Sequence, residues 1–238
     1  MDRALRTFDD WIARRDPHYV CVTNLHGIIE SQRDPRLRSI HNGAGLVTPD
    51  GMPLVWVSRL LGFRGVERVY GPDLLLAMCG HSAPRGYRHF FYGGAAGVPA
   101  QLAATLRRRF PDLQVAGTYS PPFRPLTDEE QAEIVRLINA ASPDIVWVGL
   151  GTPKQEHWMA AHTGRLTAPV LAGIGAAFDF HAGRKKQAPR WMQRSGLEWC
   201  FRLGTEPRRL WRRYATIIPT FLALFGLQFV GLREYTLD

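Results

Sequence analysis

Residues 144–158, DIVWVGLGTPKQEHW, join a short apolar run to a glycine-containing loop and the polar first turn of a helix. The run Asp144–Val148 is rich in β-branched residues and is bounded by turn residues, which predicts a buried strand. A loop is expected from Gly149 to Pro153, and a helix is expected to begin near Lys154. A strand followed directly by a helix is the repeating unit of a parallel α/β sheet.

Five further apolar runs alternate with helical stretches along the chain. They are Tyr19–Thr23, Leu46–Val47, Tyr87–Tyr92, Leu113–Gly117 and Pro169–Ile174. First-turn residues mark the helix starts between them, namely Asp34-Pro35, Pro53, Asp73, Pro99 and the capping box Thr127-Asp-Glu-Glu130. We therefore predict a Rossmann-like α/β core over residues 1–182, a mostly parallel sheet with helices on both faces, followed by a basic helical C-terminal appendage at residues 183–238.

The charge of the chain is concentrated near its C-terminal end. The 238 residues carry a formal net charge of +9, and residues 184–213 contain ten Lys or Arg against two acids. Such an excess indicates an anionic partner, which can be nucleic acid, a membrane or a phosphate-bearing substrate. The three cysteines lack metal-ligand spacing, and the first 20 residues contain no apolar signal segment, so we expect free thiols and a cytoplasmic location.

An apolar run of sixteen residues, Ile217–Leu232, follows the basic stretch. It is shorter than the roughly 20 residues that cross a bilayer as a helix, and Pro219 and Gly226 interrupt it. Next to so many basic residues, it favours peripheral association with the anionic inner face of a plasma membrane. The alternative is a pair of C-terminal helices packed on the core.

Ligands of parallel α/β sheets bind at the carboxyl ends of the strands, so polar residues just after the strands are the candidates for a site. Thr23 and Asn24 are able to bind a sugar or a base there, or to form an Asx turn. Asp50, followed by Gly51, projects a carboxylate from the edge of the sheet or simply forms a turn. Gly93-Gly94 precedes a helix start that favours phosphate.

The last two strands are followed by further candidates. Gly151, Lys154, Gln155 and Glu156 place a cation, an amide and an acid at the start of one helix, which favours a binding role. Asp179 follows the final strand and either holds a sugar hydroxyl or caps a turn. The chain contains no Asp-x-Asp, H-E-x-x-H or P-loop motif, which predicts no metal and no cofactor. Helix N-termini, Lys and Arg would then have to stabilise any diphosphate.

These residues belong to a set of motifs with a common order and spacing. The set comprises Asn24, Asp34-Pro35, Pro49-Asp50-Gly51, Gly71-Pro-Asp73-Leu74, Gly93-Gly94, Gly149-Leu-Gly-x-Pro-Lys-Gln-Glu156, Gly173-x-Gly-Ala-x-Phe-Asp179, Ala188-Pro189-x-Trp-Met-Gln193, Gly196-Leu-Glu-Trp199, Arg202-Leu203 and Glu206-Pro207. From about Tyr19 to Arg213 the chain resembles the WecG/TagA/CpsF glycosyltransferase family. The resemblance implies a bacterial enzyme that moves N-acetylmannosamine, its uronic acid or glucose from a UDP-sugar to a polyprenyl-diphosphate-linked sugar, for a surface or cell-wall polymer.

The resemblance also implies roles for single residues. The family's catalytic carboxylate falls on Asp50, which we expect to act as the general base of a metal-independent, inverting displacement. Gln187 stands where the family usually has Arg, and Lys185 or Lys186 is the candidate to replace that charge. The predicted substrate-binding residues are Thr23, Asn24, Gly51, Gly93, Gly94, Gly151, Lys154, Gln155, Glu156, Asp179, Arg190, Gln193, Arg202, Arg209 and Arg212.

Two other classes of function compete with this interpretation. A nicotinamide-dependent oxidoreductase requires an acid about 20 residues beyond its glycine motif, whereas that distance from Gly173 reaches the basic stretch 184–194. A non-enzymatic module that binds anionic lipid or nucleic acid explains the charge but leaves the polar loops without a role. We therefore expect a UDP-sugar, a lipid-linked acceptor and a membrane surface as partners, without nucleic acid; a homo-oligomer is compatible with the sequence.

Overall fold

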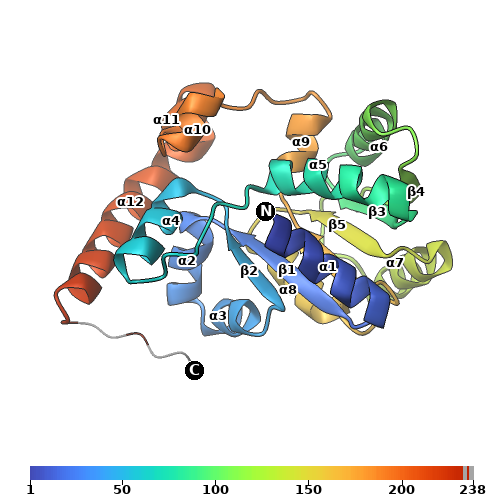
Figure 1. Ribbon diagram of the computed structural model, residues 1–238, viewed down its shortest axis with the longest axis horizontal. Coiled ribbons are helices and arrows are strands. Elements are labelled where there is room, and N and C mark those ends of the chain that lie inside the picture. The colour runs from blue at the N-terminus through green and yellow to red at the C-terminus, as the bar shows by residue number, and fades with distance from the viewer. Residues whose placement is uncertain (233–234, 236–238) are drawn as a thin grey trace.

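A single six-stranded parallel sheet forms the centre of the computed structural model, which describes residues 1–232 and 235 (Figure 1). The strand order is β2-β1-β6-β5-β3-β4. The strands are β1 (His18–Thr23), β2 (Leu46–Pro49), β3 (Arg88–Gly93), β4 (Gln114–Tyr119), β5 (Ile145–Gly149) and β6 (Val170–Gly173). All six predicted strands are present, which confirms the Rossmann-like architecture.

Helices cover both faces of the sheet, as predicted. One face is covered by α1 (Asp2–Arg14), α5 (Gly71–Ser82), α6 (Val98–Arg109) and α9 (Ala177–His181). The other face is covered by α2 (Leu25–Arg33), α3 (Pro35–Asn42), α7 (Asp128–Ala141) and α8 (Lys154–His162). A sheet covered on both faces buries its central strands except at their ends, which is why those strands are continuous apolar runs.

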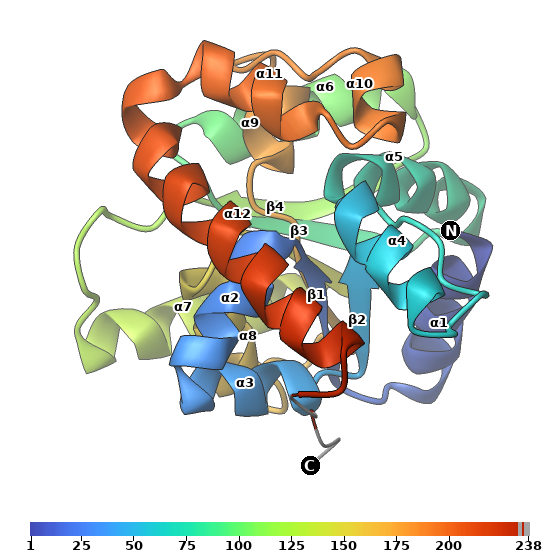
Figure 2. The same ribbon diagram turned by 90° about the vertical axis from the view of Figure 1, so that its left-hand side faces the viewer.

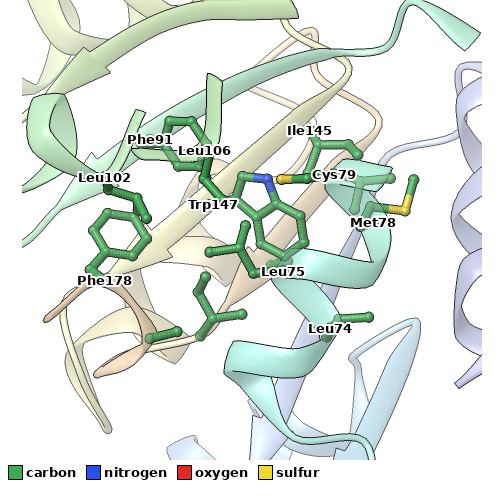
Figure 3. Close-up of a cluster of buried hydrophobic side chains, with 14 of the residues drawn as sticks. Leu74, Leu75, Met78, Cys79, Phe91, Leu102, Leu106, Ile145, Trp147 and Phe178 are labelled. Carbon is green, nitrogen blue, oxygen red and sulfur yellow. The ribbon is translucent and has the colours of Figure 1, made fainter. Parts of the chain in front are cut away.

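Trp147 of β5 occupies the centre of the larger core cluster (Figure 3). Leucines of α5 and α6 and Phe178 of α9 surround it, and its indole N–H donates to Nδ1 of the buried His89 at 2.8 Å. The neighbouring Val146 and Val148 belong to the cluster on the opposite face. The alternation follows from the period of two along a strand.

The predicted helix starts are also present. Asp34 caps α3 by accepting from the backbone N–H of Arg36 at 2.9 Å. Both halves of the capping box at Thr127 and Glu130 form, with distances of 3.2 and 2.9 Å. Pro53 lies in the first turn of α4 (Met52–Leu60), Asp73 in that of α5, and Pro99 in that of α6. Helix α1, for which we made no prediction, packs on α5 and β6.

The order of the strands sets where a ligand is able to bind. The chain leaves β3 outward toward β4 but leaves β5 in the other direction, toward β6. The loops after β3 and β5 therefore diverge, and a crevice opens between them at the carboxyl edge of the sheet.

Three helices follow the sheet: α10 (Arg190–Arg194), α11 (Glu198–Thr205) and α12 (Pro207–Phe229). A short 3-10 helix, η1 (Ala83–Arg85), completes the described elements. Helix α12 lies against α2 and runs through Pro219 without a break; it buries Leu210 and Ile217 (Figure 2). No described helix is long and apolar enough to span a membrane. The division of the chain into a core at residues 1–182 and an appendage at residues 183–238 remains a prediction. Residues 233–234 and 236–238 of the predicted appendage lie outside the described residues.

Candidate active site

A cavity of about 800 Å³ lies at the carboxyl ends of the strands. Loops after all six strands contribute to its wall, and helices α11 and α12 supply the side opposite the sheet. Of the predicted site residues, the cavity is lined by Asn24, Asp50, Gly94, Gly151, Lys154, Gln155, Asp179, Arg202 and Arg209. These residues come from segments up to 185 positions apart in the sequence, between Asn24 and Arg209, and only the fold brings them together.

Asp50 is held at the end of β2 by backbone hydrogen bonds. Its N–H donates to the carbonyl of Thr23 at 2.8 Å, and its carboxylate accepts from the N–H of Gly71 at 3.0 Å. Burial raises the pKa of this carboxyl to about 6, and Glu198 raises it further, while the Gly71 N–H, Arg68 and Arg202 oppose the rise. Near neutral pH the group is ionised and still a better proton acceptor than an ordinary aspartate.

A partly buried polar network, which the sequence analysis did not predict, adjoins Asp50. Arg68 donates to the backbone carbonyl of Asp50 at 2.5 Å and to the Glu198 carboxylate at 2.7 Å. The Tyr70 hydroxyl donates to the other oxygen of Glu198 at 3.1 Å. Arg68 and Tyr70 precede α5 in a crossover loop that returns to β2, where the Val69 N–H donates to the Pro49 carbonyl. No motif in that loop indicated this approach, whereas Glu198 was part of a recognised motif without an assigned role.

The raised pKa predicts how stability responds to pH. Because the folded-state pKa of Asp50 is about 6 and the unfolded value is near 3.8, the folded protein binds the proton more tightly, and this group lowers stability as pH rises from about 4 to about 6. Asp50→Asn keeps an acceptor for the Gly71 N–H and removes the buried charge. We expect it to raise the free energy of unfolding by up to about 3 kcal/mol at pH 8 and by almost nothing at pH 4. Denaturant unfolding at both pH values measures this; an equal effect at both would contradict the assignment.

Two glycine amides that were predicted to bind phosphate, those of Gly94 and Gly151, have acceptors within the protein. The N–H of Gly94 donates to the carbonyl of Gly149 at 2.9 Å, and the N–H of Gly151 donates to the side chain of Gln155 at 3.2 Å. These two amides are therefore already bonded. At Gly93 a Cβ would lie 2.7 Å from the carbonyl of Gly149, so this glycine, with φ of 119°, allows the close approach of the ends of β3 and β5.

Glu156 is buried behind the wall of the cavity. Its side chain is 1% exposed and does not line the cavity. One carboxylate oxygen accepts from the Thr152 hydroxyl at 2.9 Å and from the Gln155 amide at 3.0 Å, while the other oxygen is buried without a partner. Glu156 thus bonds the amide of Gln155, which does line the cavity, and the predicted contact of Glu156 with substrate stays a prediction.

Aromatic and proline residues form the end of the cavity nearest β3 and β4. Tyr92 stacks on Trp158 with ring centroids 4.2 Å apart, and the segment 121–126 after β4 arches beside them. Phe123 at the tip of this segment is almost fully exposed, 5.9 Å from the ammonium of Lys154. The cavity thus carries aromatic and proline side chains, with Lys154 and Arg124 beside them, at one end and Asp50 at the other.

Cations from the C-terminal helices face the Asp50 end. Arg202, Arg209 and Arg213 line the cavity, and Nε of Arg202 is buried without a hydrogen-bond partner among the described residues. Lys185 lines it as well, 3.4 Å from Asp179 and 3.2 Å from Glu206, and Glu206 also accepts from Arg209 at 2.7 Å. Lys185 is therefore the lysine near Gln187 that reaches the cavity, whereas Lys186 is exposed and does not line it.

Seven predicted site residues do not line the cavity, and most have structural contacts instead. They are Thr23, Gly51, Gly93, Glu156, Arg190, Gln193 and Arg212. Arg190 forms a two-pronged ion pair with Asp73 at 2.7 and 2.9 Å, which ties α10 to α5. Gln193 donates to the carbonyl of Ala188 at 2.8 Å, and Gly51 is the N-cap residue of α4.

Thr23 and Arg212 each have a neighbour in the sequence that does line the cavity. Thr23 and Asn24 were both predicted, and only Asn24 reaches the cavity, because Thr23 is buried. The carboxamide oxygen of Asn24 also caps α2 by accepting from the N–H of His26 at 3.0 Å. The guanidinium of Arg212 lies 5.4 Å from the ring of the exposed Trp211. Arg213 lines the cavity, whereas the predicted Arg212 does not. Among residues 1–232 and 235, no three His, Cys, Asp or Glu side chains gather as a metal site.

Comparison with known proteins shows the family of this chain. The model of the glycosyl transferase WecG/TagA/CpsF family matches residues 1–235. A relative from Bacillus spizizenii, named N-acetylglucosaminyldiphosphoundecaprenol N-acetyl-beta-D-mannosaminyltransferase, is 35% identical over 199 residues, which are 84% of this chain and 75% of the relative. A relative of the same name from Bacillus subtilis is 31% identical over 176 residues, 74% of this chain and 66% of the relative.

Proposed function

Because this chain belongs to the WecG/TagA/CpsF family of glycosyl transferases, we propose that it transfers a sugar from a UDP-sugar to a polyprenyl-diphosphate-linked acceptor during synthesis of a cell-wall or surface polymer. The names of the two Bacillus relatives make N-acetylglucosaminyl-diphospho-polyprenol the first candidate acceptor and N-acetylmannosamine the first candidate sugar. The uronic acid of that sugar and glucose are the alternatives.

The observation that carries this proposal is the contrast between the three carboxylates of the cavity. Asp179 lies 3.4 Å from Lys185, and Glu198 is bonded to Arg68 and Tyr70. The carboxylate of Asp50 has no side-chain partner among the described residues and accepts only the Gly71 N–H. Together with its raised pKa, this leaves Asp50 as the group suited to receive a proton.

An inverting displacement needs this one base and no covalent intermediate. In the proposed step a hydroxyl of the acceptor sugar attacks the anomeric carbon from the face opposite UDP, and its proton passes to a carboxylate oxygen of Asp50. The bond between the anomeric carbon and the diphosphate oxygen breaks, and UDP leaves with the electron pair. Arg202, Arg209 and Arg213 would stabilise the charge that grows on the leaving diphosphate and hold the diphosphate of the lipid.

The proposed location of the reaction is the anionic surface of a membrane. Helix α12 supports this, because arginines occupy its first turns and the exposed apolar residues Leu222 and Phe229 follow. Confinement of both enzyme and lipid-linked acceptor to one surface would raise the frequency of productive encounters.

Metal independence is a separate part of the proposal, and it rests on the absence of an Asp-x-Asp motif from the sequence. We expect transfer to continue unchanged in excess EDTA and to gain nothing from added Mg²⁺ or Mn²⁺. Initial rates with and without each addition measure this. Loss of transfer in EDTA that a divalent ion restores would overturn this part and leave the role of Asp50 to be tested by itself.

The central experiment is a panel of UDP-sugars with a short-chain, water-soluble polyprenyl-diphosphate N-acetylglucosamine as acceptor. One donor is expected to give a lipid-linked disaccharide whose anomeric configuration, read by NMR, is inverted relative to the donor. If protein that is folded and bound to vesicles shows no transfer and no release of UDP with any donor, the proposal is contradicted. Vesicle binding without turnover would instead indicate a lipid-binding module.

A further inference from the structure

Helix α4 and the turn after it present apolar side chains that the described structure leaves largely exposed. Trp56 is 43% exposed, Leu60 is 64% exposed and Phe63 is 63% exposed. Trp56 and Leu60 lie four residues apart and so share one side of the helix. Every residue from 59 to 65 is exposed. Soluble monomers rarely leave large contiguous apolar patches uncovered unless the patch binds something. We call Trp56 and residues 59–65 the α4 tip.

The charge around the α4 tip indicates what would cover it. Between Asp50 and Glu67 the chain contains no acidic residue, and Arg59 and Arg64 flank the exposed apolar side chains. Basic residues beside inserted apolar side chains are attracted to anionic headgroups. A second copy of this chain would bring the same arginines against each other, and each chain carries a net charge of +9. The charge therefore favours an anionic lipid surface over self-association.

The position of the α4 tip relative to the base supports the same partner. Helix α4 begins two residues after Asp50, and its nine residues extend about 14 Å, at 1.5 Å for each residue. The headgroup layer of one leaflet is roughly 5 to 8 Å thick. With the tip at the boundary of the acyl chains, Asp50 would lie just above the headgroups, where a sugar carried on a lipid diphosphate projects into water.

Helix α12 lies on the same side of the molecule. Figure 1 shows α4 and α12 next to each other on its left-hand side, and Figure 2, which looks onto that side, shows both helices in front of the sheet. Trp56 packs against Gly196, in the turn between α10 and α11, so that α4 is held in place next to the C-terminal helices. The exposed apolar residues of α4 and of α12 thus lie on the same side of the molecule.

We propose that the α4 tip is a second lipid-contacting element, which inserts into an anionic leaflet beside α12 and sets the height of Asp50 above the membrane. The insertion itself follows from exposure and charge; its benefit to catalysis rests on the proposed function. Apolar insertion at two separate points would hold the cavity in one orientation, whereas a single helix would leave the protein free to rotate about it.

The test uses the full chain with vesicles of phosphatidylglycerol and phosphatidylcholine. Leu60→Glu combined with Phe63→Glu is expected to weaken vesicle binding about tenfold or more, since each change removes a large apolar side chain from lipid. The matched control is Leu137→Glu, because Leu137 is 41% exposed on α7, far from α4 in Figure 1, and it is expected to leave vesicle binding unchanged. Thermal unfolding checks that all variants are folded.

Two results would overturn the proposal. One is a double variant that binds these vesicles as tightly as the unaltered chain. The other is a vesicle-free dimer, seen by analytical ultracentrifugation, that the double variant abolishes, since the tip would then be an interface between copies. Transfer to the water-soluble acceptor separates this proposal from the proposed function. The double variant should retain this transfer. If the unaltered chain itself shows no such transfer, only the proposed function is contradicted.

Discussion

Asp50→Asn is expected to lower kcat for sugar transfer by roughly 10²- to 10⁴-fold, with little change in the KM for the UDP-sugar. The asparagine keeps the size of the side chain and an oxygen for the Gly71 N–H, so the loop at the end of β2 should keep its shape. It is not able to accept the proton of the attacking hydroxyl. Steady-state transfer to the water-soluble acceptor measures the effect under conditions where membrane binding plays no part.

The matched control is Asp179→Asn, which changes a second carboxylate of the same cavity. Because Asp179 lies beside Lys185, its loss should alter substrate binding more than kcat. The pH profile is a further check: kcat/KM should rise with pH through about 6 as Asp50 loses its proton and then level off, and the residual activity of Asp50→Asn should lack this step. Near-normal kcat in Asp50→Asn would remove Asp50 from the mechanism.

Replacement of Arg202 and Arg213 by glutamine is expected to lower kcat/KM by roughly 10²- to 10³-fold for each residue. Both side chains line the cavity on the side opposite the sheet, where the diphosphate groups of donor and acceptor would lie. Glutamine preserves much of the length and the hydrogen-bonding capacity of the side chain but removes the charge. A charge that stabilises the departing diphosphate acts most strongly in the transition state, so kcat should fall as well.

Arg212→Gln is the matched control for this series, because it removes the same charge from the same helix. Its guanidinium lies by the exposed Trp211 and not in the cavity. With the water-soluble acceptor, Arg212→Gln should cost far less activity than Arg213→Gln, whereas binding to anionic vesicles should weaken similarly for both. Equal loss of transfer in the two variants would mean that the arginines act through net charge alone.

The sheet was predictable from the sequence because a strand buried on both faces leaves a strong local pattern. Ile145–Gly149 is such a strand, and its apolar run and flanking turn residues are visible without any knowledge of the partner strands. The loops at the carboxyl ends were predictable for the same reason. Asp50, Asn24 and Gln155 were found because each follows a strand, and the parallel topology places all such loops at one edge.

Hydrogen bonding in those loops was not predictable. The backbone amides of Gly94 and Gly151 were predicted to bind phosphate, but the carbonyl of Gly149, at the end of β5, and the side chain of Gln155 already accept from them. Arg68 reaches Asp50, and Tyr70 reaches the adjacent Glu198, from a crossover loop that does not follow a strand directly. Which donors stay unpaired depends on contacts between segments far apart in the chain, and these leave no local pattern.

The alternation of strands and helices, the polar loops at one edge of the sheet and the charge of the C-terminal quarter can all be read from the amino-acid sequence. Which of those charges enter the cavity depends on how α12 packs in the folded protein. Leu210 and Ile217 pack inward from α12 and so fix the rotation of the helix about its axis. Arg213, three residues after one and four before the other, shares their side, while Arg212 points away from it. A helix with arginines on several sides has no preferred face until it packs, because its rotation is set by burial and not by the charges themselves.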